Sequence, residues 1–295
     1  MLIGDRHFVD YWQSTLDEVA ALQATPVRSV EMPLRSNEIS TAWGFSFTGI
    51  GDYPLFAYYL VPKGSGPFTP LFQAPGYGSV VAVPAWERRD RFAVMALCHR
   101  GQRLSDDNYK AAYPGLLTDG LPKKKTYIWR EVVADCIRAI DVLVDQPEIN
   151  SGNLAISGSD LAFQSAALRD DVKVLLTSGQ VLFADREHYS AKTTDAYPQQ
   201  EFNDFRRLNP EQWEESESTL ALFDLVKFAP NITANTLLAA SGLSEFSIVS
   251  ITDEMNAEVK VLPSTEYSAL DHIAQENWLA EAAGESKHPG PFLPR

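Results

Sequence analysis

The chain contains 295 residues, of which 45% are hydrophobic, and it carries a formal net charge of −14. That length accommodates one large α/β domain or two small ones, and the negative charge argues against nucleic acid or an anionic membrane as a partner. Cys98 and Cys136 are too few for a disulfide framework and lack metal-ligand neighbours at a useful spacing. The N-terminus mixes charged and apolar residues, unlike a signal peptide, and no apolar run approaches the roughly 20 residues that span a bilayer. We therefore expect a soluble, cytoplasmic protein without metal or cofactor that acts on or binds a small molecule.

The predicted elements alternate between strand and helix along most of the chain. Apolar residues at helical spacing predict an N-terminal helix at 8–22, and two β-type runs around Gly49, Gly51 and Asp52 predict a hairpin at 43–64. Further strands are predicted at 69–75, 92–101, 152–159, 172–180, 235–243 and 257–263. Longer helices are predicted at 127–146 and 161–169.

This alternation predicts an α/β fold with a mostly parallel sheet and helices on both faces. We expect one domain over residues 1–295, in which residues 1–65 form an N-terminal helix and β-hairpin extension. The polar stretch at about 183–218, which contains aromatic residues, interrupts this alternation of strands and helices. We expect it to form a helical cap over the carboxyl edge of the sheet. Ligands of such sheets bind beyond the carboxyl ends of the strands, so the site is expected there.

The stretch "ISGSDLA" at 156–162 has the outline of a nucleophile elbow with an aspartate, Asp160, at its apex. Such a turn needs small residues two positions before and after the apex, and Gly158 and Ala162 meet that requirement. The positive end of the following helix favours an anion there. Asp160 is equally well suited to be an ordinary helix N-cap. Ser159 is a less suitable nucleophile, because it is expected to point away from the apex.

Residues after other strands are suitable companions for Asp160. The backbone N–H groups of Leu161 and of Tyr77, in "QAPGYGS", are candidates for an oxyanion hole. Glu245 is the candidate charge-relay acid and His272 the candidate base, in the order nucleophile, acid, histidine that is typical of this sheet type. The alternatives are an ordinary glycine turn around Tyr77 and a surface histidine on the last helix.

Several stretches together resemble the acetyl xylan esterase and cephalosporin-C deacetylase family of α/β-hydrolases. They are "FVDYWQSTLDEV", "FSFTGIGDYPLFAYYLVPKG", "APGYG", "HRGQR", "YIWREVVADCIRAIDVLVDQPEIN", "LAISGSDLA" and "ASGLSEF", in the family's order and at about its spacing. The most specific is Arg100-Gly101-Gln102, which matches a motif that braces the active-site region in relatives. The resemblance implies an α/β-hydrolase fold, oxyanion roles for Tyr77 and Leu161, deacetylation of small acetylated substrates, and a homo-oligomer, often a ring-like hexamer with a β-extension.

The chain departs from the family pattern at the reactive residues. The family's elbow reads Gly-Gly-Ser-Gln-Gly-Gly, whereas residues 158–163 read Gly-Ser-Asp-Leu-Ala-Phe. Glu245 replaces the family's aspartate. A match without gaps puts Tyr267 at the position of the family's histidine, so His272 can serve only if the loop before it is about five residues longer. The family's serine mechanism therefore cannot be inferred for this chain.

A carboxylate at the elbow suits attack on an alkyl halide or an epoxide, which forms an alkyl ester that water can hydrolyse, better than attack on an ester, which forms a high-energy anhydride. Halide sites commonly have a tryptophan after the nucleophile, where this chain has Leu161. Epoxide chemistry needs acidic hydroxyls, for which Tyr189, Tyr197 and Tyr267 are candidates.

Four interpretations stay open at this point. Asp160 is the nucleophile of a hydrolase, or it is a general base for water, which needs a raised pKa. Alternatively, the chain is a catalytically silent relative that binds an acetylated or carbohydrate-like ligand or serves as a structural subunit. The fourth interpretation is esterase activity by a route other than the family's serine mechanism. Contact between His272 and Asp160, with Glu245 behind, would favour the hydrolase. A solvent-facing His272, with Tyr267 in the family's position, would favour the silent relative.

Overall fold

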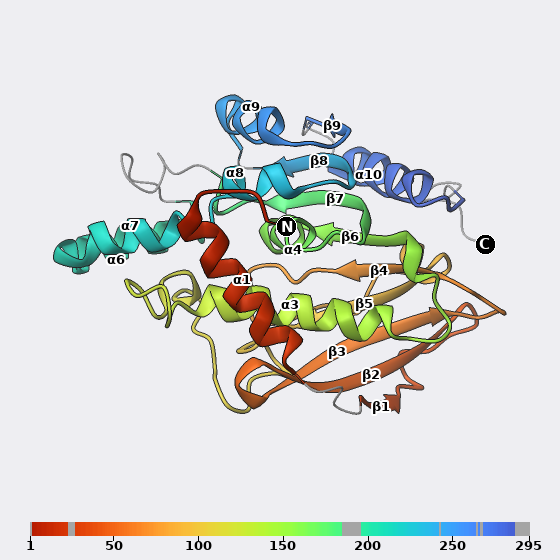
Figure 1. Ribbon diagram of the computed structural model, residues 1–295. Helices are drawn as coiled ribbons and strands as arrows, with labels where there is room; N and C mark the ends of the chain where they lie inside the picture. The colour runs from red at the N-terminus through yellow and green to blue at the C-terminus, as the bar shows by residue number, and fades with distance from the viewer. Residues whose placement is uncertain are drawn as a thin grey trace.

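The computed structural model describes residues 2–22, 27–184, 196–241, 243–263, 265 and 268–286. Within this part of the chain, nine strands form one sheet in the order β1-β2-β3-β5-β4-β6-β7-β8-β9 (Figure 1). They are β1 (Arg28–Glu31), β2 (Ser40–Gly49), β3 (Tyr53–Pro62), β4 (Thr69–Gln73), β5 (Phe92–Cys98), β6 (Leu154–Gly158), β7 (Val172–Gln180), β8 (Asn235–Ser241) and β9 (Val259–Val261). Neighbours from β5 to β9 pair in parallel, whereas β1, β2, β3 and β5 pair antiparallel in succession. The prediction of a mostly parallel sheet is confirmed.

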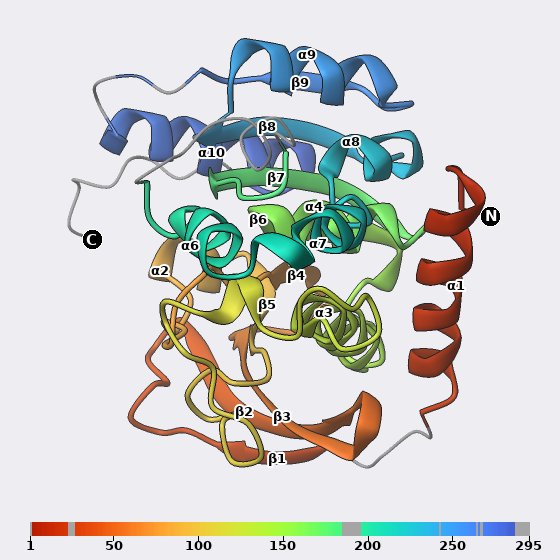
Figure 2. The same ribbon diagram turned by 90° about the vertical axis from the view of Figure 1, so that its left-hand side faces the viewer.

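Helices cover both faces of the sheet. The helices are α1 (Arg6–Ala20), α2 (Trp86–Arg89), α3 (Ile128–Val144), α4 (Asp160–Ala167), α6 (Gln200–Leu208), α7 (Trp213–Leu220), α8 (Leu225–Phe228), α9 (Glu245–Glu254) and α10 (Ser268–Ala282). Figure 2 shows α1, α3 and α4 on one side and α2 and α10 on the other. Side chains alternate along a strand, so Leu175 of β7 enters the core beneath α3 and α4, and Leu176 enters the core beneath α10. None of the described helices has the length and apolar character to cross a membrane.

The N-terminal region forms the helix and the hairpin that were predicted for it. Strands β2 and β3 pair continuously from Ser40↔Pro62 to Gly49↔Tyr53. Helix α1 is anchored by Trp12, whose indole N–H donates to the carbonyl of Leu222 at 2.9 Å. Strand β1 was not predicted, because all four of its residues are exposed and show no alternation of burial.

Helix α6 and most of α7, which ends at Leu220, lie within the predicted cap at 183–218, of which residues 185–195 fall outside the described part of the chain. Figure 1 shows both helices beyond the tips of β4 and β8, at the carboxyl edge of the sheet. Glu201, in the first turn of α6, accepts a hydrogen bond from the backbone N–H of Leu117 at 3.0 Å. This bond holds the start of α6 beside the loops of that edge.

Candidate functional site

The turn between β6 and α4 has the tight packing that was predicted for an elbow. Gly158 has a φ of +145°, and a Cβ built on it would lie 3.0 Å from the Cβ of Ala74 and 3.3 Å from the Cβ of Ala162. Positions 158 and 162 therefore both need small residues. Asp160 begins the helix, and Asp52 and Leu104 are the only non-glycine residues with positive φ in the described part of the chain. The turn thus places its unusual backbone geometry on Gly158, and Asp160 does not have the strained apex conformation of a nucleophile elbow.

The carboxylate of Asp160 points into the protein, and both of its oxygens accept hydrogen bonds. Oδ1 accepts from the backbone N–H groups of Leu182 at 3.0 Å and Phe183 at 2.9 Å, and Oδ2 lies 3.0 Å from the nitrogen of Leu182. The residue is only 1% exposed. Burial raises the pKa of Asp160 to about 6, although the N–H donors act in the opposite direction. Asp160 therefore connects the start of α4 to the segment that follows β7.

A cavity of about 300 Å³ lies next to this turn, at the carboxyl edge of the sheet. Its described lining consists of Ala74, Gly76, Tyr77, Gly158, Ser159, Ser178, Gly179, Gln180, Leu182, Tyr197 and Pro198. Ser159 belongs to this lining and Asp160 does not, which is the reverse of the predicted arrangement. Hydroxyl, amide and aromatic groups come from two tyrosines, two serines and Gln180, and none of the described lining side chains carries a formal charge. The cavity suits a small, neutral, polar molecule.

Tyr77 contributes its side chain as well as its backbone to this cavity. Its hydroxyl donates a hydrogen bond to the carboxylate of Glu201, and its ring packs edge-on against Tyr113 at 5.2 Å and Tyr197 at 5.6 Å between centroids. Burial raises the pKa of Glu201. Glu201 was not among the predicted site residues, because nothing in the local pattern of the cap distinguishes it from the surface acids of the same stretch.

The structure does not bring the three predicted catalytic side chains together. Glu245 is exposed at the first position of α9. The imidazole of His272, on α10, is about half exposed and lies 3.1 Å from the carboxylate of Glu87 on α2. Asp160 contacts neither of them, since its described partners belong to β6–α4 and to the segment after β7. The structure therefore does not show the arrangement in which His272 reaches Asp160, because this histidine contacts Glu87 instead.

The remaining predicted residues fall in different places. Tyr77 lines the cavity, whereas Leu161 is buried in the core beneath α3 and α4. Tyr197 is half exposed at the cavity. Tyr189 and Tyr267 lie outside the described residues. The N-cap alternative for Asp160 does not hold either, since the helix begins at Asp160 and the N-cap is Ser159, which makes no side-chain capping bond.

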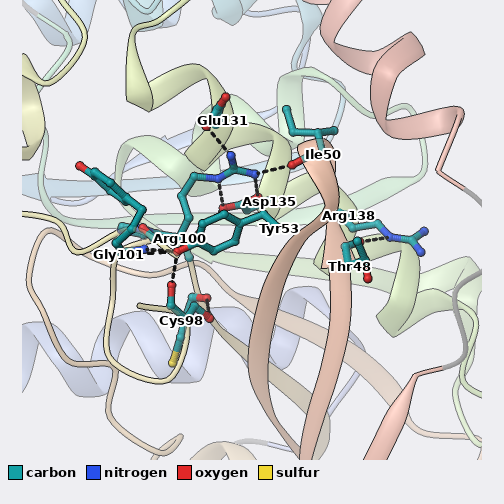
Figure 3. Close-up of polar contacts among 12 residues, drawn as sticks. Thr48, Ile50, Tyr53, Cys98, Arg100, Gly101, Glu131, Asp135 and Arg138 are labelled. Atoms are coloured by element: carbon teal, nitrogen blue, oxygen red, sulfur yellow. Dashed lines mark hydrogen bonds and ion pairs between the residues drawn. The ribbon is translucent and has the colours of Figure 1, made fainter. Parts of the chain in front are cut away.

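Arg100 forms a buried ionic cluster beside the site (Figure 3). Its guanidinium donates to the two carboxylate oxygens of Asp135 at 2.9 and 2.7 Å, to Glu131, and to the carbonyl of Ile50 at 3.2 Å. The guanidinium also lies 4.7 Å from the ring centre of Tyr53. These contacts join α3, the hairpin and the end of β5, so the loop after β5 has a fixed position.

Gln102 connects this fixed loop to the loop that lines the cavity. Its Oε1 accepts from the backbone N–H of His99 at 3.0 Å, and its Nε2 donates to the carbonyls of Gly76 at 3.2 Å and Gly78 at 2.7 Å. Gly101 between them has a φ of +81°, a conformation that glycine adopts readily. The side chains of the Arg-Gly-Gln motif thus hold the loop that carries Tyr77.

Asp160→Asn is expected to change how stability depends on pH. The pKa of about 6 in the folded protein exceeds the ordinary aspartate value of about 3.9, so this carboxyl favours folding most below pH of about 4 and loses that contribution as pH rises through about 6. The difference between these two pKa values corresponds to roughly 3 kcal/mol of unfolding free energy. The asparagine variant cannot ionise, so its stability does not fall in this way as the pH rises. Urea unfolding of both proteins on either side of this pH window measures it.

The exposed Asp10→Asn variant, which disrupts a surface ion pair with Arg6, is the matched control for loss of a carboxylate. A free-energy difference between wild type and Asp160→Asn that is the same at both ends of the pH window would contradict the buried, desolvated position of Asp160.

Comparison with known proteins assigns the chain to a family. The model of the acetyl xylan esterase family matches residues 4–273. The acetyl esterase Axe7A of Xylanibacter ruminicola is 25% identical over 245 residues, which cover 77% of this chain and 54% of that protein. This chain therefore spans about half the length of that curated relative.

Two solved structures have the same fold as this chain. The acetyl xylan esterase from Paenibacillus sp. R4 superposes with a TM-score of 0.73 and 22% identity, covering 90% of each chain. Acetyl xylan esterase 1 from Thermoanaerobacterium sp. JW/SL YS485 superposes with a TM-score of 0.79 and 18% identity, covering 96% of this chain and 95% of that one. The predicted α/β-hydrolase fold is confirmed. Together with the family match over residues 4–273, these findings show that the chain belongs to the acetyl xylan esterase family.

Proposed function

We propose that this chain is a catalytically silent member of the acetyl xylan esterase family that binds a small, neutral, acetylated or carbohydrate-like molecule at the carboxyl edge of its sheet. The observation that carries the proposal is the orientation of Asp160. Its carboxylate accepts hydrogen bonds from the N–H groups of Leu182 and Phe183, and Asp160 is not among the described residues that line the cavity. A family member whose elbow residue has this structural role lacks a nucleophile at the family's position.

The two catalytic interpretations of Asp160 find less support. A carboxylate nucleophile has to approach the reacting carbon, and a histidine has to activate water for the second step. His272 instead contacts Glu87, and Asp160 is buried. A pKa of about 6 suits a general base. A base must also lie within hydrogen-bond reach of its water, directly or through one bridging molecule, and the carboxylate oxygens are directed at backbone donors.

The cavity lining supports a neutral ligand. Two tyrosines, two serines and Gln180 supply hydroxyl and amide groups, and the rings of Tyr77 and Tyr197 supply apolar faces. A volume of about 300 Å³ lies at the lower end of the range for small-molecule pockets, which corresponds to a ligand the size of one sugar unit. The relatives named acetyl xylan esterase and acetyl esterase make an acetylated sugar the first candidate.

Esterase activity through Ser159 is the second candidate. Ser159 lines the cavity, and its hydroxyl lowers the pKa of Asp160 through a hydrogen bond. In this alternative Ser159 attacks the acyl carbon and Asp160 accepts the hydroxyl proton. The first proposal is favoured because this pair lacks the histidine that shuttles the proton to the leaving group.

Hydrolysis of p-nitrophenyl acetate distinguishes the candidates. We expect the wild type, Ser159→Ala and Asp160→Asn to hydrolyse the ester at the rate of buffer alone, because no activated nucleophile lines the cavity. Ser178→Ala, which removes another hydroxyl from the same cavity, is the matched control. Wild-type hydrolysis that Ser159→Ala or Asp160→Asn abolishes and Ser178→Ala preserves would overturn the silent assignment.

Calorimetry with an O-acetylated methyl xyloside tests the binding half of the proposal. We expect saturable binding that Tyr197→Ala weakens by roughly tenfold, because an aromatic face is worth about 1.4 kcal/mol at such a contact. Leu208→Ala is the control, since Leu208 is 73% exposed on α6 and is not among the lining residues. Absence of saturable binding by the folded wild type, with either the acetylated or the unacetylated xyloside, would contradict this half of the proposal.

A further inference from the structure

A second pocket, of about 500 Å³, lies on the side of the sheet that α1, α3 and α4 cover, and we call it the α1 pocket. Its described walls come from the N-terminal segment at residues 2–3, from α1, from Ile137 and Asp141 of α3, from residues 167–171 at the end of α4, and from the segment before β8. Figures 1 and 2 show that α1 lies outside α3 and crosses it. The α1 pocket and the cavity at the carboxyl edge have no described lining residue in common, so they are separate sites.

Hydrogen bonds join two walls of the α1 pocket. The side chain of Asn231 holds the backbone of Ile3, since its Oδ1 accepts from the N–H of Ile3 at 2.7 Å and its Nδ2 donates to the carbonyl of Ile3 at 2.9 Å. Asp5 then caps α1, and its carboxylate lies 2.8 Å from the Nζ of Lys227. The start of the chain is thereby fixed to the segment before β8. A ligand of this pocket meets walls that are already ordered, which lowers the entropic cost of binding.

Much of the wall is apolar. Val19, Ile137 and Leu168 line the pocket and are almost fully buried. Leu2 and Leu16 line it as well but are only half-buried, so apolar surface remains that a ligand can cover. Burial of a hydrocarbon chain against this surface is favourable.

The charged side chains of the described lining are one arginine, Arg169, and three aspartates, Asp141, Asp170 and Asp171. Arg169 is already paired on both sides. Its Nη1 donates to Asp141 at 2.5 Å, and its Nε and Nη2 donate to the two carboxylate oxygens of Asp171 at 2.8 and 2.7 Å. The side chain of Asp170 has no ion pair or hydrogen bond with any other described residue. The described lining therefore carries an excess of negative charge, and Asp170 is available to a cation.

We propose that the α1 pocket binds a protonated aliphatic amine, with its hydrocarbon chain against Leu16 and the apolar wall and its ammonium group beside Asp170. A carboxylate accepts the N–H groups of an ammonium ion, and the acidic lining attracts a positive charge and repels a negative one. A volume of about 500 Å³ lies within the range for small-molecule pockets. This site does not depend on the proposed function, because it has no described residue in common with the cavity.

Titration calorimetry of the full chain with hexylamine tests the proposal. Hexanol and hexanoate are the comparison titrants, because they have the same hydrocarbon chain with a neutral or a negative head group. We expect saturable binding of one hexylamine per chain and binding of hexanol that is roughly fivefold weaker, since an exposed ion pair contributes up to about that factor. Hexanoate should bind more weakly still, because the acidic lining repels it.

Two variants with matched controls locate the binding site. Asp170→Asn should weaken hexylamine binding by roughly three- to fivefold. Asp10→Asn removes an exposed carboxylate of α1 that is outside the described lining, so it should leave the affinity unchanged. Ala20→Phe adds a ring at an exposed lining position and should abolish binding by filling the pocket, whereas Ala21→Phe adds the same ring at an exposed position outside the described lining.

The contrary results are equally specific. Absence of saturable hexylamine binding by the wild type would overturn the proposal, and so would binding of hexanol or hexanoate as tightly as hexylamine. Equal weakening by Asp10→Asn and Asp170→Asn would show that only the overall charge attracts the amine. Full affinity in Ala20→Phe would place the amine elsewhere on the protein. Circular dichroism confirms that each variant is folded.

Discussion

The buried carboxylate of Asp160 is the interaction on which the arrangement of the carboxyl edge depends. It joins the first residue of α4 to the backbone of Leu182 and Phe183, where the chain leaves β7. A buried carboxylate needs such donors, because leaving it without partners would cost several kcal/mol. The donors in turn need an acceptor at this point, since a buried N–H group without one is also unfavourable. In the function proposed above, Asp160 holds the edge of the sheet together instead of reacting at it.

The Arg-Gly-Gln motif fixes the loops around the cavity. Arg100 joins α3 to the hairpin through Asp135 and the carbonyl of Ile50, and Gln102 holds the carbonyls of Gly76 and Gly78. The loop with Tyr77 is consequently held against a cavity that contains hydroxyl and aromatic groups. The binding role proposed above uses this positioned cavity, and the contact of Tyr77 with Glu201 adds a link to the helices beyond the edge.

The parts of the fold that follow from local periodicity were predictable, and those that depend on distant partners were not. Alternation and helical spacing predicted the parallel sheet and the hairpin, and steric reasoning predicted small residues at Gly158 and Ala162. The direction of the Asp160 side chain depends on backbone N–H groups 22 and 23 residues later. The partner of Tyr77 lies 124 residues away and that of His272 lies 185 residues away. No motif around these residues encodes such pairings. The sequence predicted that Asp160, Glu245 and His272 lie close together, and the structure gives Asp160 and His272 other partners.

Amide hydrogen exchange at Leu182 and Phe183, measured by NMR in the wild type and in Asp160→Ala, shows whether the carboxylate of Asp160 holds these two backbone groups. Exchange reports whether an N–H group keeps its acceptor. We expect slow exchange of both amides in the wild type and fast exchange in the variant, with the interior amide of Leu176 in β7 protected in both proteins. Fast exchange of Leu182 and Phe183 in the folded wild type would contradict this expectation, because the carboxylate of Asp160 would then be free to turn towards the cavity.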